Sequence, residues 1–217
     1  MFTIAAVCYM KINEIFYSIQ GEGLWTGMPN VFIRTTGCNL RCSYCDTKYA
    51  YAEGKDHSID SVFKAIKIFK CKQVCITGGE PTLQPDIYEL TDVLLENEYL
   101  ICMETNGSMD ISKIIQKNVL LSLDIKCPSS GMSDKMLFKN LDLLRESDQL
   151  KFVIKDHNDF LYSKNILEKY LPVCTVFFQP VWGTNFEVLA KWILKNNLKV
   201  KLGLQIHKVI WGDKLTV

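Results

Sequence analysis

The chain has 217 residues, of which 48% are apolar and 23% are charged, a composition typical of one globular domain with a large hydrophobic core. The formal net charge of +1 excludes a general electrostatic attraction to nucleic acid or to an anionic membrane. No apolar run reaches the roughly 18 residues that span a bilayer, so we expect neither nucleic acid nor membrane as a partner.

The first nine residues are apolar, but no basic residue precedes them and no clear cleavage site follows. They are therefore not expected to be a secretory signal peptide. An odd number of cysteines, nine, also fits a reducing cytoplasm, where we expect the protein to reside. A second methionine, Met10, precedes a sequence that is more typical of the beginning of a protein. We expect residues 1–10 to be a dispensable N-terminal extension and residues 11–217 to form the single domain.

Apolar runs alternate with helical patterns along most of the chain. Strands are expected at residues 12–19, 31–34, 74–77, 99–103, 119–126, 150–155, 175–180 and 200–206. Helices are expected at residues 59–70, 86–97, 111–116, 135–145, 160–170 and 186–196. Ser58 is a good N-cap for the first of these helices. Alternation repeated this often predicts a parallel α/β architecture in one domain.

Three of the cysteines, Cys38, Cys42 and Cys45, lie within eight residues after the strand at 31–34. Such spacing without a secretory signal favours a metal site over a disulfide. Three thiolates can hold three corners of an iron–sulfur cube and leave the fourth iron open to a small molecule. Two alternatives are a structural zinc site, which usually has four ligands, and a closed cluster with Cys71 or Cys75 as the fourth ligand.

Polar and glycine residues directly follow four of the predicted strands. They lie at residues 77–80, 104–107, 124–126 and 179–180. In a β/α barrel the carboxyl ends of the strands build the active site, so these clusters and the cysteine loop can meet at one mouth. Taken alone, residues 20–23 indicate a simple turn, and Arg34 is either a surface charge or a planar anion clamp.

The spacing of three and then two residues between the cysteines, ahead of a parallel α/β body, resembles that of the radical S-adenosylmethionine superfamily. The resemblance implies an incomplete parallel β/α barrel, a 4Fe-4S cluster on the three cysteines, and S-adenosylmethionine on the open iron. In that superfamily one electron from the cluster cleaves the cofactor to a 5′-deoxyadenosyl radical, which abstracts a substrate hydrogen. Residues 78–81, Gly-Gly-Glu-Pro, resemble the superfamily's motif beside the methionine amino group.

Five further stretches narrow the resemblance, which runs from about Lys11 to the C-terminus. Residues 14–23, 32–34, 45–47, 104–107 and 205–207 together resemble the 7-carboxy-7-deazaguanine synthase family. That family converts 6-carboxy-5,6,7,8-tetrahydropterin to 7-carboxy-7-deazaguanine with ring contraction and loss of ammonia, on the route to queuosine and other deazapurines. The resemblance implies the same carbon–nitrogen lyase activity, magnesium as a further cofactor, and no catalytic residue beyond the cofactor radical.

The resemblance also implies roles for individual residues. The substrate would be contacted by Ile19, Gln20, Gly21, Glu22, Arg34, Thr77 and His207. S-adenosylmethionine would be contacted by Tyr44, Gly79, Glu80, Glu104, Ile125, Lys126, Cys127, Gln179, Pro180, Val181 and Trp182. Thr47 would bind magnesium through its hydroxyl. Arg34 has the fork that pairs with a carboxylate, and Gln20 and Glu22 match an aminopyrimidinone edge.

Two parts of the chain depart from the family pattern. Asp124 and Ile125 precede Lys126 where family members often have Ser-Pro-Lys. The tail from Trp211 to Val217 is longer than in some members, in which the terminal carboxylate meets the substrate region. The family further implies a flavodoxin or ferredoxin as electron donor, and a homodimer. Two alternative functions stay open: a glycyl-radical enzyme activase of the same superfamily, and a non-enzymatic, metal-stabilised binding module.

Overall fold

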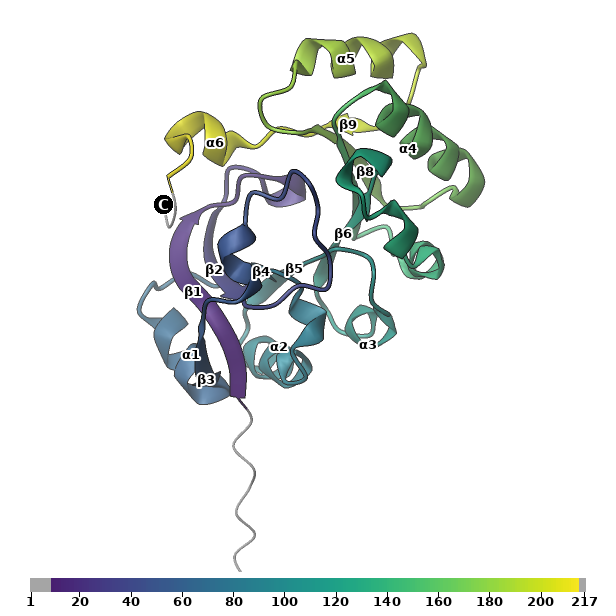
Figure 1. Ribbon diagram of the computed structural model, residues 1–217. Helices are drawn as coiled ribbons and strands as arrows, with labels where there is room; N and C mark the ends of the chain where they lie inside the picture. The colour runs from purple at the N-terminus through teal and green to yellow at the C-terminus, as the bar shows by residue number, and fades with distance from the viewer. Residues whose placement is uncertain (1–8, 215–217) are drawn as a thin grey trace, which may run out of the picture.

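The computed structural model describes residues 9–214, which form a curved sheet with helices packed against it (Figure 1). The strands are β1 (Tyr9–Ile19), β2 (Pro29–Thr35), β3 (Lys55–Ser58), β4 (Gln73–Gly78), β5 (Leu100–Thr105), β6 (Leu120–Lys126), β7 (Gln149–Ile154), β8 (Thr175–Pro180) and β9 (Lys201–Leu202). The helices are α1 (Ile59–Lys67), α2 (Ile87–Glu96), α3 (Ser112–Ile115), α4 (His157–Tyr170), α5 (Phe186–Lys195) and α6 (Ile206–Trp211).

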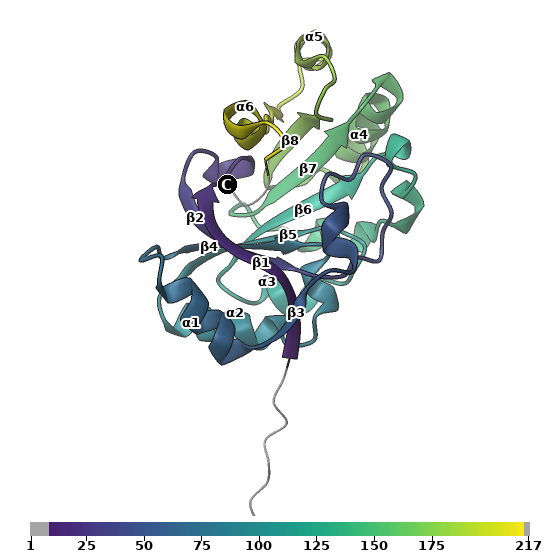
Figure 2. The same cartoon turned by 60° about the vertical axis from the view of Figure 1, so that its left-hand side comes forward.

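Within the described residues the sheet has nine strands in the order β3-β1-β2-β4-β5-β6-β7-β8-β9. It is parallel from β2 to β9, whereas β1 runs antiparallel to both of its neighbours. β3 and β9 lie at opposite ends of this order, so the curved sheet stays open, as Figure 2 shows. The prediction of an incomplete parallel β/α barrel is confirmed.

The hydrophobic core lies between the sheet and the helices that connect its strands. α1 begins after Ser58, whose side chain accepts a hydrogen bond from Ser61 N, as expected of an N-cap. Val62 and Ile66, four residues apart on one face of α1, are fully buried. Along each strand, successive side chains alternate between this core and the concave face of the sheet. The concave face is therefore available for polar side chains.

The segment predicted as a helix at residues 135–145 forms two shorter 3-10 segments instead, Ser133–Lys135 and Phe138–Leu143. Asn140 is fully buried there. Its side-chain amide donates to Gly107 O at 3.2 Å and to Met109 O at 2.7 Å. These bonds tie the segment to the loop after β5, which favours short turns over one continuous α-helix.

The strand predicted at residues 200–206 covers only Lys201 and Leu202. The chain leaves the sheet at Gly203, whose N donates to Phe178 O at 2.8 Å. α6 then begins at Ile206, whose N donates to Gly21 O at 3.0 Å. The end of the described chain thus crosses back to the end of β1, where Figure 1 shows α6.

β1 begins at Tyr9, and Met10 is fully buried where β1 pairs with β3. The last two residues of the predicted extension 1–10 therefore belong to the sheet. Residues 1–8 and Val217 lie outside the described residues, and with them the predicted dispensability of the extension and the role of the terminal carboxylate. Among residues 9–214, no helix combines the length and apolar character needed to cross a membrane.

Candidate active site

A cavity of about 600 Å³ opens on the concave face of the sheet. This volume lies in the range of small-molecule binding sites. Its walls come from β1, β2 and β4 to β8, from the cysteine loop and from α6. The strand-end clusters and the cysteine loop do meet in one place. The residues to which the resemblance gave a role all line the cavity, except Glu80, Ile125 and Cys127.

The cysteine loop is held in place by its backbone. Glu80 N donates to Gly37 O at 2.8 Å, which joins this loop to the loop after β4. Ser43 N donates to Ser130 O at 3.0 Å, which joins it to the segment after β6. All three cysteine thiols are reduced, partly exposed and directed to the same cavity.

The electrostatics of these thiols fit a bound cluster whose iron–sulfur core is cationic. Burial raises the pKa of Cys42, and the nearby thiols of Cys45 and Cys38 raise it further, although Lys126 opposes the rise. Iron ions would remove this mutual repulsion by binding all three groups as thiolates. Within residues 9–214 no three His, Cys, Asp or Glu side chains converge to hold one metal ion. The thiolates of a cube bind three different irons and need not converge on one point.

The two cysteines considered as a fourth cluster ligand lie elsewhere. Cys71 has its thiol near Pro29 O, at 3.6 Å. Cys75 is buried in β4, where Gln20 Nε2 donates to its sulfur at 3.3 Å. Neither cysteine lines the cavity. The arrangement of the described residues therefore gives no support to a closed cluster built on either thiol.

Gly78 and Gly79 bring the loop after β4 against the cysteine loop. Gly78 has φ of +139°, a conformation that favours glycine. A Cβ added to Gly79 would lie 2.0 Å from Gly37 O, so a larger residue would push the two loops apart. Close approach of the two loops therefore explains Gly79, whereas Gly78 is explained by its backbone conformation and by its packing against Thr35 at the end of β2.

Glu80 does not face the cavity. It is fully buried, and its carboxylate accepts hydrogen bonds from Thr82 N (3.1 Å), Thr82 Oγ1 (2.7 Å), Thr105 Oγ1 (2.8 Å) and Asn106 N (2.6 Å). Burial raises the pKa of Glu80, and these donors oppose the rise. The side chain anchors its loop to the end of β5, and the contact with a cofactor ammonium group that the resemblance implied stays a prediction.

Ile125 and Cys127, for which cofactor contacts were predicted, do not line the cavity. Both side chains are fully buried in the core, and the predicted contacts of these two residues with the cofactor stay predictions. Asp124 and Lys126 line the cavity instead, because side chains alternate between the two faces of a strand.

Other residues predicted on the cofactor side line the cavity. They are Tyr44, Gln179, Pro180, Val181 and Trp182. The Tyr44 hydroxyl donates to Val153 O at 3.3 Å, and burial raises its pKa. Gln179 is 2% exposed, and its Oε1 has no hydrogen-bond partner among the described residues. A buried acceptor without a partner fits a donor group on a bound cofactor.

Glu104, which was predicted to contact the cofactor, contacts two predicted substrate residues. Gln20 Nε2 donates to Glu104 Oε1 at 3.3 Å. Thr77 Oγ1 donates to Glu104 Oε2 at 2.9 Å. Ile19 ends β1 just before Gln20 and lines the cavity beside it. The structure thus places Glu104 in the middle of the predicted substrate-binding set.

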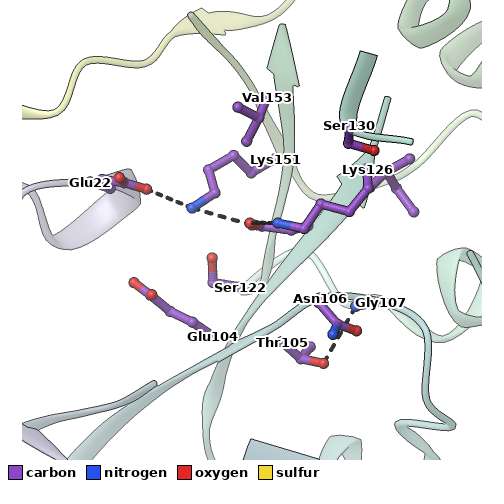
Figure 3. A network of polar contacts seen from close by, with 12 residues as sticks. Glu22, Glu104, Thr105, Asn106, Gly107, Ser122, Lys126, Ser130, Lys151 and Val153 are labelled. Carbon is purple, nitrogen blue, oxygen red and sulfur yellow. Dashed lines mark hydrogen bonds and ion pairs between the residues drawn. The ribbon is translucent and has the colours of Figure 1, made fainter. Parts of the chain in front are cut away.

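A row of alternating charges crosses the cavity wall (Figure 3). Lys151 Nζ lies 2.5 Å from Glu22 Oε2 and 3.2 Å from Asp124 Oδ1. Asp124 Oδ2 in turn lies 2.8 Å from Lys126 Nζ. Neither Lys151 nor Asp124 was among the residues with a predicted role. A lysine inside the apolar strand at 150–155 was the available signal, because a buried lysine needs anionic partners.

His207 and Gln205 approach the same part of the wall from the other end of the chain. Gln205 Nε2 donates to Glu22 Oε1 at 2.8 Å. A Cβ on Gly21 would lie 1.9 Å from His207 Nδ1, so the absence of a side chain at Gly21 is what admits the imidazole. The tail and the end of β1 thus form one continuous surface.

Arg34 lies in the cavity wall, where neighbouring side chains fix its guanidinium group, and it is not a free surface charge. Its Nε donates to Glu14 Oε1 at 2.6 Å, and its side chain is 15% exposed. The rings of Phe16 and Tyr49 flank it, with centroids 5.8 and 5.7 Å from Cζ. Tyr49 also donates its hydroxyl to Glu14 Oε1 at 3.2 Å. This setting fits a planar anion clamp.

Thr47 lines the cavity just after the cysteine loop. Its hydroxyl donates to Asp46 Oδ1 at 2.9 Å, and Asp46 lines the cavity as well. A hydroxyl beside a carboxylate is a donor set that fits magnesium, which prefers oxygen ligands. Asp46 was not among the residues predicted from the sequence.

Comparisons with known proteins agree with this arrangement. The family model described as the radical SAM superfamily matches residues 32–147. The 7-carboxy-7-deazaguanine synthase of Methanospirillum hungatei is 39% identical over 205 residues, which cover 93% of this chain and 85% of that protein. The 7-carboxy-7-deazaguanine synthase of Thermoplasma acidophilum is 37% identical and covers 94% of this chain and 98% of that protein.

A solved structure has the same fold. The crystal structure of QueE from Escherichia coli matches with a TM-score of 0.76 at 23% identity, over 91% of this chain and 94% of that one. The matched family model, the identity to the two relatives over most of their length, and this fold agree with one another. The chain belongs to the 7-carboxy-7-deazaguanine synthase family of the radical SAM superfamily.

Proposed function

We propose that this chain catalyses the ring contraction of 6-carboxy-5,6,7,8-tetrahydropterin to 7-carboxy-7-deazaguanine with loss of ammonia, a step toward queuosine and other deazapurines. Family membership supports the reaction. One observation carries the assignment to this site: a single cavity is lined both by three cysteine thiols and by the hydrogen-bonding set of Gln20, Glu22 and Glu104. Radical generation and pterin recognition would therefore share one cavity.

The wall residues divide between the bound groups. The three cysteines would hold a 4Fe-4S cluster, and Tyr44, Gln179 and Trp182 would hold S-adenosylmethionine. When bound, these groups supply the carbon-centred radical that takes a hydrogen atom from the substrate. The chain itself holds the pterin next to that radical and limits the access of water. Phe16 and Phe32, stacked with centroids 4.9 Å apart, contribute apolar wall for this purpose.

The pterin edge carries both donors and acceptors, and the wall offers both. Gln20 and Glu104 supply an amide and a carboxylate. Burial opposes ionisation of Glu22, but Lys151, His207 and Gln205 outweigh it and lower the pKa of this carboxyl to about 2. Glu22 therefore accepts hydrogen bonds throughout the physiological pH range.

Replacing Arg34 by alanine is expected to weaken substrate binding. Loss of charge-assisted hydrogen bonds of about 1.5–3 kcal/mol corresponds to a KM for the pterin that is about 10- to 100-fold higher. Reductive cleavage of S-adenosylmethionine without substrate should continue at the wild-type rate. Steady-state kinetics of Arg34→Ala and Arg34→Lys measure this, with Lys as the variant that keeps the charge. An unchanged KM in Arg34→Ala would argue against the carboxylate clamp.

We propose that Thr47 binds magnesium. Thr47→Ala should then lose the stimulation of product formation by magnesium, whereas Thr47→Ser, which keeps the hydroxyl, should retain most of it. The measurement is the ratio of initial rates with and without added Mg²⁺ in chelator-treated enzyme. Equal stimulation in Thr47→Ala and wild type would remove Thr47 from the site.

An anaerobic turnover assay tests the proposed function. Reconstituted enzyme, reductant, S-adenosylmethionine, Mg²⁺ and the carboxylated tetrahydropterin should yield 7-carboxy-7-deazaguanine and one ammonia per product. Cofactor cleavage without any product would keep the superfamily chemistry and reject the substrate. A glycyl-radical activase would instead transfer its radical to a partner enzyme. In the cell we propose a flavodoxin or ferredoxin as the electron donor, and a homodimer as the assembly.

A further inference from the structure

Lys151 lies inside β7 with only 5% of its surface exposed. Its Nζ has a carboxylate on either side, Glu22 from the segment after β1 and Asp124 from β6. Removing an ammonium group from water costs several kcal/mol unless partners compensate for the loss. Lys151 lines a ligand cavity and not the hydrophobic core. Its two carboxylate partners keep its charge stable there, so we expect its role to lie in what it does to those carboxylates.

The contacts of Lys151 reach both sides of the cavity. Glu22 Oε1, on the far side of the carboxylate, accepts from Gln205 Nε2 at 2.8 Å. Asp124 Oδ2 pairs with Lys126 Nζ at 2.8 Å, and the charge of Lys126 is felt by Cys42 in the cysteine loop. Figure 3 shows Lys151 between Glu22 and Lys126 in this row. Lys151 thus connects the predicted substrate side to the cofactor side.

We propose, on the basis of the proposed function, that Lys151 is a positioning residue for substrate specificity. It fixes the Glu22 carboxylate in one orientation as an acceptor for the N–H donors of the pterin's aminopyrimidinone edge, and ties that acceptor to the Asp124 and Lys126 pair. Each Glu22 oxygen accepts one protein hydrogen bond and has a second lone-pair site for the substrate. Lys151 itself would act through Glu22 and not on the reacting atoms.

The pH dependence of binding would reveal this role. Glu22 is faced by His207 and Gln205 from the tail, Lys151 from β7 and, beyond it, Asp124 from β6. With Lys151 present, the pKa of Glu22 is about 2, so Glu22 does not titrate between pH 5 and 8. Without it, burial favours the protonated acid, because desolvation is the largest influence on this carboxyl. The pKa of Glu22 then rises, and acceptor capacity is lost as the pH falls toward 5.

The experiment measures anaerobic binding of the pterin to reconstituted enzyme from pH 5 to 8, together with KM and kcat. Lys151→Met should raise the Kd and KM about 10- to 100-fold at pH 7.5, the loss expected when a hydrogen-bonded charge partner is removed. The pH profile of binding to Lys151→Met should also have an acidic limb, in which the affinity for the pterin falls further below pH 6. Glu22→Gln should show neither that limb nor further loss when Lys151→Met is added, because the two residues act as one unit.

Two features keep the outcomes distinct. The double variant Glu22→Gln/Lys151→Met removes both charges, so it should fold even if Lys151→Met alone leaves too much unpaired charge. Lys117→Met, which breaks a lysine–aspartate pair outside the cavity with Asp92, should match wild type. If wild type neither binds nor converts the pterin, the proposed function fails. If wild type does both and the pH profile of Lys151→Met parallels it, the positioning role of Lys151 is overturned.

Discussion

Replacing Cys42 by alanine should abolish turnover and cofactor cleavage together. Two thiolates would remain for three irons of the cube, so reconstituted protein should hold less iron and sulfide and lose its cluster absorbance. The expected loss of 5′-deoxyadenosine formation is at least about 1,000-fold, which corresponds to a barrier higher by about 4 kcal/mol. Iron and sulfide analysis with an anaerobic cleavage assay measures both effects.

Cys71→Ala is the matched control for Cys42→Ala. Cys71 is also a partly buried free thiol, but it lies outside the cavity, so iron content and cleavage should match wild type. Retained cleavage in Cys42→Ala would contradict the ligand set. Loss of the cluster in Cys71→Ala would instead favour a closed cluster with Cys71 as its fourth ligand.

Replacing Glu80 by alanine should destabilise the protein before any cofactor is bound. The change would leave the buried donors of Thr82, Thr105 and Asn106 without their acceptor. A buried donor that loses its acceptor costs about 1–3 kcal/mol, so the loss for these several donors together is expected to be about 3–5 kcal/mol. For a chain of this size, each kcal/mol lowers Tm by about 2–4 °C, so a fall of about 6–20 °C is expected. Thermal unfolding of the cluster-free protein under anaerobic reducing conditions measures it.

The same variant separates the two roles considered for Glu80. If Glu80 contacted the cofactor ammonium, cluster-free stability would change little and the Kd for S-adenosylmethionine would rise. Glu89→Ala, an exposed change on α2, should alter the unfolding free energy by less than about 0.5 kcal/mol. A Glu80→Ala protein as stable as Glu89→Ala would contradict the anchoring role.

The parts of the fold that follow from local pattern could be predicted from the sequence. Residues 74–77 and 175–180 are short apolar runs followed by polar residues, and parallel strands place such ends at one edge. The helix predicted at 135–145 was wrong because its outcome depends on Asn140, whose amide bonds to the distant loop after β5. The spacing of apolar residues along the segment does not reveal a hydrogen bond to a distant loop.

In the candidate site, too, some features could be predicted from local pattern and others depend on distant contacts. The alternation of β6 could have separated Lys126, which lines the cavity, from the buried Ile125 and Cys127, because period two fixes which side chains share a face. The burial of Glu80 depends on donors supplied by Thr105 and Asn106, more than 20 residues later. The partners of Lys151 are Glu22, which lies 129 residues away in the sequence, and Asp124, its register partner on the neighbouring strand β6. Such pairings arise from the folded topology and are not visible in a single sequence.

The most direct test of the central claim, that this cavity carries out radical chemistry on a pterin, follows the abstracted hydrogen. The enzyme would be turned over anaerobically with pterin deuterated on its reduced ring carbons, and S-adenosylmethionine would be recovered. We expect 7-carboxy-7-deazaguanine, ammonia, and deuterium in the recovered S-adenosylmethionine, because we propose that the cofactor is regenerated at the end of each turnover. Deuterium-free cofactor, with 5′-deoxyadenosine accumulating and no product formed, would contradict the claim.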